Sequence, residues 1–158
     1  MQRDAQSNKL VVDLGTVTLD STGDDAGSVD LDTKGARAVS FILIPDATLT
    51  TQDTLFQVLE SDDDAATDPY AKVAEENYLP TETATTQGGE AGVPLIEAVA
   101  PYQQVTGVFS TKRWLRPNFH TDTSQASIDV QVIAVMEMDT GSQVSVYDPA
   151  VDTVDGNA

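Results

Sequence analysis

The chain has one histidine, His120, and it lies close to two residues that could work with it, Asp122 and Ser124. In a Ser/His/Asp site the histidine takes the proton of the nucleophilic hydroxyl. The run from His120 to Ser124 is turn-like, however, and offers neither a nucleophile elbow nor oxyanion donors. Cysteine is absent, which excludes thiol nucleophiles and thiolate zinc sites. We therefore expect no catalytic residues and no cofactor.

A second group with possible chemistry is the acidic run Asp62, Asp63 and Asp64, which Glu60 and Asp68 flank. Carboxylate oxygens are the ligands that Ca²⁺ prefers in proteins. The spacing does not match an EF-hand loop, which needs a glycine at its sixth position and a glutamate at its twelfth. The run therefore predicts a solvated hairpin tip without a metal, and Asp62, Asp63 and Asp64 are the alternative candidates for a cation.

Three of the eight basic residues fall within five positions, namely Lys112, Arg113 and Arg116. Such an island in an acidic chain can contact an acidic partner, where it contributes mainly to specificity and to the association rate. The other interpretation is intramolecular pairing with the aspartate-rich loops, and we favour this second one. Both interpretations stay open on the sequence alone.

The charge of the chain limits its partners. Twenty-six acidic residues against eight basic ones give a net charge of −18. Nucleic acids and anionic membrane surfaces are bound by neutralising them with Lys and Arg, so neither is an expected partner. No apolar run reaches the roughly 20 residues of a membrane span, and Met1 to Leu10 lacks the apolar core of a signal peptide. These features predict a soluble, unexported chain, whose acidity suits either a salty habitat or high solubility.

The chain length of 158 residues with 40% hydrophobic residues is enough for one domain with one core. Apolar and β-branched runs separated by turn residues predict antiparallel strands rather than helices. The run Ala36–Ile44 is apolar on both faces, which predicts a central strand that is covered on both sides. Trp114 is expected in the core. The expected strands are Lys9–Leu19, Ser28–Asp32, Ala36–Ile44, Thr54–Ser61, Tyr70–Ala74, Val105–Ser110, Lys112–Phe119, Ala126–Met136 and Gln143–Tyr147, with Pro94–Pro101 as a short strand or a helical turn.

These elements predict an all-β fold, an antiparallel β-sandwich or jelly-roll-like single domain with a long polar loop and flexible termini. We expect an amino-terminal arm over residues 1–8, the sandwich over 9–147 and a flexible acidic tail over 148–158. Residues 75–104 are expected as a long insertion, because from Glu75 to Gly92 the sequence is polar and has no apolar period.

The order of several motifs resembles that of small structural proteins encoded beside the major capsid protein in tailed bacteriophages. The resemblance covers about Leu10 to Asp139. The insertion from Glu75 to Gln104 and the acidic tail after Asp139 depart from the compact pattern of these proteins. The motifs that carry the resemblance are Leu10–Gly15, Val29–Phe41, Phe56–Asp64, Thr111–Pro117 and the apolar strand Ile128–Met136.

The resemblance implies a non-enzymatic decoration or cement protein on the capsid exterior. Its partner would be the major capsid protein, its location the virion surface after assembly in the host cytoplasm, and its own state a homo-oligomer, with a trimer favoured. We expect the island to face the capsid and the acidic loops to face solvent. The candidate capsid contacts are Lys112, Arg113, Arg116, Met1, Gln2 and Arg3. The alternatives are a virion surface module for a host glycan or calcium-dependent adhesion, and a head-completion or tail component.

Overall fold

Antiparallel strands make up nearly all the regular structure of the computed structural model, which describes residues 9–20, 22–47, 54–79, 84–87, 89–95, 104–122 and 127–138. None of these ranges holds a helix that is long and apolar enough to cross a bilayer. One 3₁₀ turn covers Glu75–Asn77. The strands are β1 (Lys9–Leu19), β2 (Gly23–Ala26), β3 (Leu31–Asp32), β4 (Ala36–Pro45), β5 (Thr54–Ser61), β6 (Ala71–Lys72), β7 (Tyr78–Leu79), β8 (Thr85–Gln87), β9 (Glu90–Pro94), β10 (Gln104–Val108), β11 (Trp114–Thr121) and β12 (Ile128–Met138).

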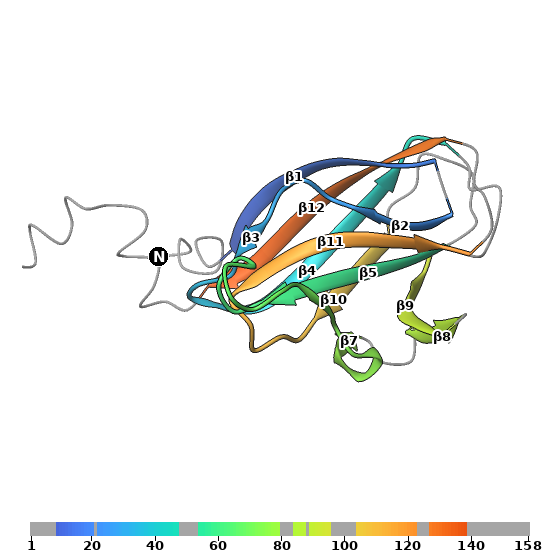
Figure 1. Cartoon of the computed structure of the whole chain (residues 1–158). Coiled ribbons are helices and arrows are strands. Elements are labelled where there is room, and N and C mark those ends of the chain that lie inside the picture. The colour runs from blue at the N-terminus through green and yellow to red at the C-terminus, as the bar shows by residue number, and fades with distance from the viewer. Residues whose placement is uncertain are drawn as a thin grey trace, which may run out of the picture.

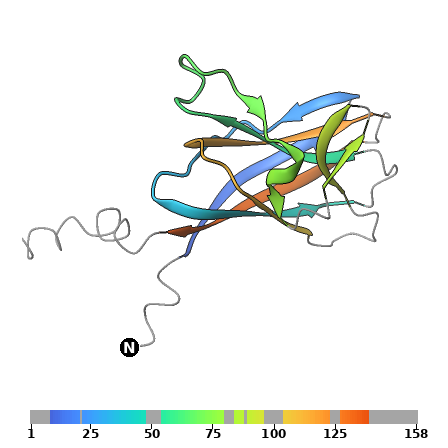
Figure 2. The ribbon, with the colours of Figure 1, turned by 90° about the horizontal axis from the view of Figure 1, so that it is seen from below.

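The strands form two sheets that pack face to face (Figures 1 and 2). One sheet has the order β1-β12-β4-β10-β7. The other has the order β2-β11-β5-β9-β8, with β3 paired to β11 and β6 paired to β5. All pairings are antiparallel. The predicted all-β sandwich is therefore confirmed.

Alternation along β12 shows why the sequence forms this layer. Its even-numbered residues, from Ile128 to Met138, are all buried, while the odd-numbered ones, such as Asp129, lie on the other face. Successive side chains of a strand point to opposite faces, so one face of β12 supplies the core. β12 lies between β1 and β4 in the sheet, which satisfies its backbone on both sides.

Three phenylalanines from three strands meet in the core between the sheets. The ring of Phe56 on β5 lies 5.4 Å from that of Phe41 on β4 and 5.4 Å from that of Phe119 on β11. The rings are tilted by 57° and 56°, which is a favourable arrangement for aromatic pairs. Because β4 belongs to one sheet and β5 to the other, this group joins the two layers.

Residues 75–104, where the sequence predicts a long polar insertion, hold regular structure in their described part. This part contains the 3₁₀ turn, β7, β8 and β9, and β10 begins at its end (Figure 1). Tyr78 is fully buried, and its hydroxyl accepts a hydrogen bond of 2.9 Å from the Val58 amide. Val58 lies on β5 between the residues that pair with β6 and those that pair with β9. The Tyr78 hydroxyl therefore takes the place of a strand partner for the Val58 amide.

Gly92 explains how β9 reaches the sheet. A Cβ atom at this position would lie 2.7 Å from the Phe56 carbonyl oxygen. Only glycine allows the two backbones to approach so closely. The hairpin of β8 and β9 therefore depends on Gly92, a residue type that in the sequence indicates a loop.

Other predicted elements differ in detail. Gly23–Ala26, which has turn-like residues, is the strand β2, and only Leu31–Asp32 of the predicted Ser28–Asp32 strand is extended in a ladder. Trp114 is half-buried and lies outside the core, with the Arg113 guanidinium 5.1 Å from its ring centroid. The predicted arm 1–8, the strand Gln143–Tyr147, the tail 148–158 and residues 96–101 lie outside the described residues.

Candidate functional site

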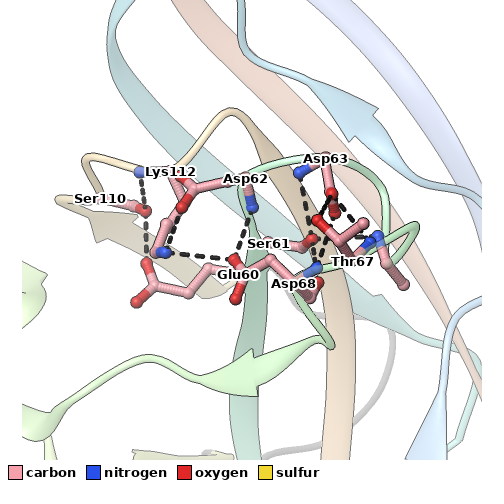
Figure 3. Close-up of polar contacts among 9 residues, drawn as sticks. Glu60, Ser61, Asp62, Asp63, Thr67, Asp68, Ser110 and Lys112 are labelled. Carbon is pink, nitrogen blue, oxygen red and sulfur yellow. Dashed lines mark hydrogen bonds and ion pairs between the residues drawn. The ribbon is translucent and has the colours of Figure 1, made fainter.

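The tip of the hairpin between β5 and β6 is built by side chains that bind its own backbone. The Ser61 hydroxyl donates to the Asp68 carbonyl at 2.6 Å and accepts from the Ala65 amide at 3.0 Å. Asp63 accepts from the backbone amides of Thr67 and Asp68 and from the Thr67 hydroxyl (Figure 3). These bonds lower the pKa of Asp63, the Thr67 hydroxyl having the largest effect. The tip is thus an ordered hairpin loop.

Lys112 of the β10–β11 turn binds the carboxylates of this tip. Its ammonium group contacts Asp62 and lies 3.1 Å from Asp68 Oδ2, while Ser110 of the same turn donates to Glu60 (Figure 3). The Asp62 amide and the Lys112 ammonium group together lower the pKa of Asp68. Within the described ranges no three His, Cys, Asp or Glu side chains are placed to hold a metal ion. Of the three alternative calcium candidates, Asp62 thus pairs with Lys112.

Arg113 and Arg116 each bind one aspartate through two nitrogens. Arg113 Nε and Nη2 lie 2.8 Å and 2.6 Å from the oxygens of Asp32, and Arg116 Nε and Nη2 lie 2.5 Å and 2.9 Å from those of Asp30. Bidentate pairs of this kind are stronger and more directional than single contacts. Each guanidinium group lowers the pKa of its aspartate partner.

Tyr70 adds a third partner to the Arg116 pair. The Arg116 Cζ atom lies 4.2 Å from the centroid of the Tyr70 ring, and the Tyr70 hydroxyl donates to Asp64 Oδ1 at 3.0 Å. Burial and the neighbouring carboxylates raise the pKa of Tyr70. The side chains of Asp30 and Arg116 are 21% and 30% exposed, which makes this the most protected ion pair of the island.

The structure thus brings all three basic residues of the island onto aspartates of other segments, and intramolecular pairing is confirmed. We call this surface the end cluster; it consists of Asp30, Asp32, Asp62, Asp68, Lys112, Arg113 and Arg116. The cluster therefore contains basic residues of the island and aspartates of the acidic loops together. Met1, Gln2 and Arg3 lie outside the described residues.

A second polar network on the seven-stranded sheet has no signal in the sequence. The Lys72 ammonium group lies between Asp24 and Glu90, at 3.1 Å and 2.5 Å, so β6 is joined to β2 and β9. Burial acts to raise the pKa of Asp24, but hydrogen bonds from His120 and Lys72 outweigh it and lower the pKa. Only tertiary contact makes these residues neighbours, because Asp24 and Glu90 lie 66 positions apart in the chain.

His120 belongs to this network and lies in β11, not in a loop. Its Nδ1 atom is 2.7 Å from Asp24 Oδ1 and its Nε2 atom is 3.1 Å from Asp122 Oδ1. Both ring nitrogens therefore have carboxylate partners, and Ser124 lies outside the described residues. This arrangement holds the imidazole in place and leaves neither nitrogen facing a hydroxyl nucleophile among the residues described.

Replacing Lys112 with methionine is expected to loosen the hairpin tip without unfolding the sandwich. The change leaves Asp62 and Asp68 without their shared cation, and exposed pairs of this kind contribute little to the stability of the fold. Hydrogen exchange should speed up at the amides of residues 62–68 and stay unchanged in β12. Lys34→Met, at an exposed turn, is the control. Unchanged exchange at the tip would show that the lysine does not order it.

Comparisons with known proteins find structural similarities at low sequence identity. No protein-family model matches this chain, and no curated protein does. The SPBc2 prophage-derived protein YomS aligns with 81% of this chain and 91% of its own at 11% identity and a TM-score of 0.42. The CBM22-1-GH10 modules of Clostridium thermocellum xylanase 10B align with 85% of this chain and 27% of theirs at 10% identity and a TM-score of 0.39. Eiger TNF from S. frugiperda aligns at 5% identity over 88% of this chain and 98% of its own, with a TM-score of 0.31.

Proposed function

We propose that this chain is a non-enzymatic structural protein of a tailed-phage particle, which binds the capsid exterior and stabilises it. The proposal rests on the positions, in the structure, of the motifs that resemble those of capsid-associated proteins. Leu10–Gly15 falls in β1, Phe56–Asp64 covers β5 and its tip, and Thr111–Pro117 leads into β11. The motifs of the resemblance therefore lie in strands of both sheets and in the end cluster, rather than in one local loop.

The end cluster supports a role in adhesion. It presents fixed charges of both signs, at least three of which are substantially exposed, on segments that bidentate pairs hold in place. Ordered charges of this kind select a complementary partner and exclude a wrong one. We propose that Lys112, Arg113 and Arg116 contact the major capsid protein, together with the amino-terminal Met1, Gln2 and Arg3. A protein that binds only the assembled shell stabilises it by mass action.

Reversing the charge of Arg113 is expected to weaken the binding of the purified chain to phage particles at least about tenfold. The particles used are ones that lack this protein. Arg113 is the most exposed cation of the end cluster, at 47%, so Arg113→Glu changes the surface with little effect on the core. Cosedimentation of the purified chain with the particles measures the binding. Arg113→Lys keeps the charge and should keep most of the binding. Equal binding by the wild type and Arg113→Glu would show that Arg113 is not part of the contact with the capsid.

Copy number tests the proposal against a head-completion or tail component. A decoration protein repeats with the capsid lattice, whereas a connector or tail ring occurs once per particle. Quantitative mass spectrometry of purified particles should find copies in proportion to the major capsid protein. A copy number that fits a single ring, or absence from mature particles, would contradict a decoration role.

A further inference from the structure

The outer face of the five-stranded sheet is apolar at its centre. Two rows of cross-strand neighbours run over it: one joins Ile133, Ile42 and Val105, and the other runs from Val11 and Val135 to Leu79. Val11, Val105 and Leu79 are 63%, 61% and 48% exposed. We call this surface the apolar face; it consists of Val11, Ile42, Ile44, Leu79, Val105, Ile133 and Val135.

This face differs from the rest of the molecular surface. The outer side of the other sheet carries the ion pairs of Lys72 and His120, as expected for a chain with 26 acidic residues. Among the residues that the structure describes, the charged side chains of this face lie around its margin. The sequence predicted a central strand covered on both sides at Ala36–Ile44. β4 is central, between β12 and β10, but Ile42 and Ile44 remain partly accessible, so the covering of its second face is not seen among the described residues.

The two ends of the apolar face carry opposite charges. At one end lie Lys9, which pairs with Glu137 in the ladder, and Arg37, which forms an ion pair with Glu137. At the other end lie Asp46 and Asp129, in an open depression of about 330 Å³. Its lining is Thr16, Ile44, Pro45, Asp46, Asp129 and Gln131.

We propose that a second copy of this chain covers the apolar face, with the two sheets packed face to face about a twofold axis that lies across the strands. This axis reverses the strand direction, so the Lys9 and Arg37 end of one copy lies over the acidic end of the other. With the axis over the row of Ile133, Ile42 and Val105, this row packs against its own copy, and each Lys9 lies near an Asp129. An isologous contact requires a surface that is complementary to itself, and the opposite charges of the two ends meet this requirement.

The proposal goes beyond capsid binding and differs from the trimer that the resemblance implies. A contiguous apolar surface is the usual mark of a protein interface, and its burial stabilises association in proportion to the area removed from water. The net charge of −18 on each copy opposes association. Salt screens this repulsion, with a Debye length of roughly 4 Å at 0.5 M. Self-association is therefore best measured at that ionic strength.

Sedimentation equilibrium of the purified full chain in 0.5 M NaCl tests the proposal without any particle. We expect twice the 16.8 kDa chain mass for the wild type. Val11→Glu and Val105→Glu each place two buried carboxylates in the interface and should give the monomer mass, with unchanged circular dichroism. Val29→Glu is the matched control, since Val29 is also exposed, at 39%, but lies outside the apolar face; it should remain a dimer.

A charge exchange tests the orientation of the two copies. In 0.15 M NaCl, Lys9→Glu should weaken dimerisation roughly two- to thirtyfold, because the twofold axis repeats each pair, and adding Asp129→Lys should restore it. A monomeric wild type at about 100 µM would overturn the proposal, as would a trimer, or a dimer that survives both valine substitutions. Failure of the restoration by Asp129→Lys would overturn the antiparallel arrangement. None of these results depends on binding to a capsid.

Discussion

Replacing Tyr78 with phenylalanine is expected to lower the free energy of unfolding by about 1–3 kcal/mol, although it removes only one oxygen atom. The Tyr78 hydroxyl is the acceptor for the Val58 amide in the core. Without it the amide stays buried and unpaired, and the loss of that hydrogen bond is not compensated by water. Burial raises the pKa of Tyr78 to about 12, so the hydroxyl stays protonated over the whole usable pH range.

Tyr78→Ala should cost more, about 3–5 kcal/mol, because it also leaves a cavity between the sheets. Urea unfolding monitored by circular dichroism measures both changes. Tyr70→Phe is the matched control, since the Tyr70 hydroxyl bonds to an exposed carboxylate and its removal should cost under about 1 kcal/mol. If Tyr78→Phe were as stable as the wild type, the segment around β7 would not be part of the cooperative core.

Replacing Asp30 with asparagine is expected to cost about 1–2 kcal/mol at pH 7, between the values for exposed and fully buried ion pairs. The Arg116 guanidinium group holds the pKa of Asp30 below its unfolded value of 3.8. A carboxyl group whose pKa is lowered by folding contributes stability above its unfolded pKa. This contribution disappears as the pH falls through the folded pKa. The difference between wild type and Asp30→Asn should therefore be constant from pH 7 to about 5 and shrink below about pH 4.

The repulsion between charges on the whole molecule also changes with pH, because the net charge approaches zero near the pI of 4.1. Taking the difference between wild type and Asp30→Asn at each pH cancels this shared change. Asp20→Asn, at an exposed position, should differ from the wild type by less than about 0.5 kcal/mol throughout. A double-mutant cycle with Arg116→Gln should assign most of the cost to the pair. A difference that persists unchanged at pH 3 would show that Asp30 stabilises the fold by something other than its charge.

Both predictions concern side chains that join separate segments of the chain. Tyr78 closes a gap beside β5, and the Asp30–Arg116 pair ties the segment before β3 to β11. Each residue is buried or paired by a segment far away in the chain. The function proposed for the end cluster therefore depends on the same contacts that stabilise the sandwich.

The amino-acid sequence by itself determined the strands whose pattern is strong, because alternation of apolar and polar residues is a local property. Lys9–Leu19, Thr54–Ser61 and the strand around Ile128–Met136 lie where the pattern placed them. The all-β class follows from these strands and from the turn residues between them. Charge and the lack of cysteine likewise limited the possible chemistry without any structure.

Only the tertiary structure decided where the polar segments go and which charges meet. Residues 75–92 have no apolar period, yet Tyr78 and Gly92 are fixed by the side chain and the backbone that they contact on β5. The partners of Arg113 and Arg116 lie 81 and 86 positions away, so no spacing in the sequence reveals them. The apolar face also arises from register, since Val11, Ile133, Ile42 and Val105 become neighbours only when β1, β12, β4 and β10 are paired. Strand pattern is local, whereas pairing, burial and charge contacts depend on which distant segments the fold brings together.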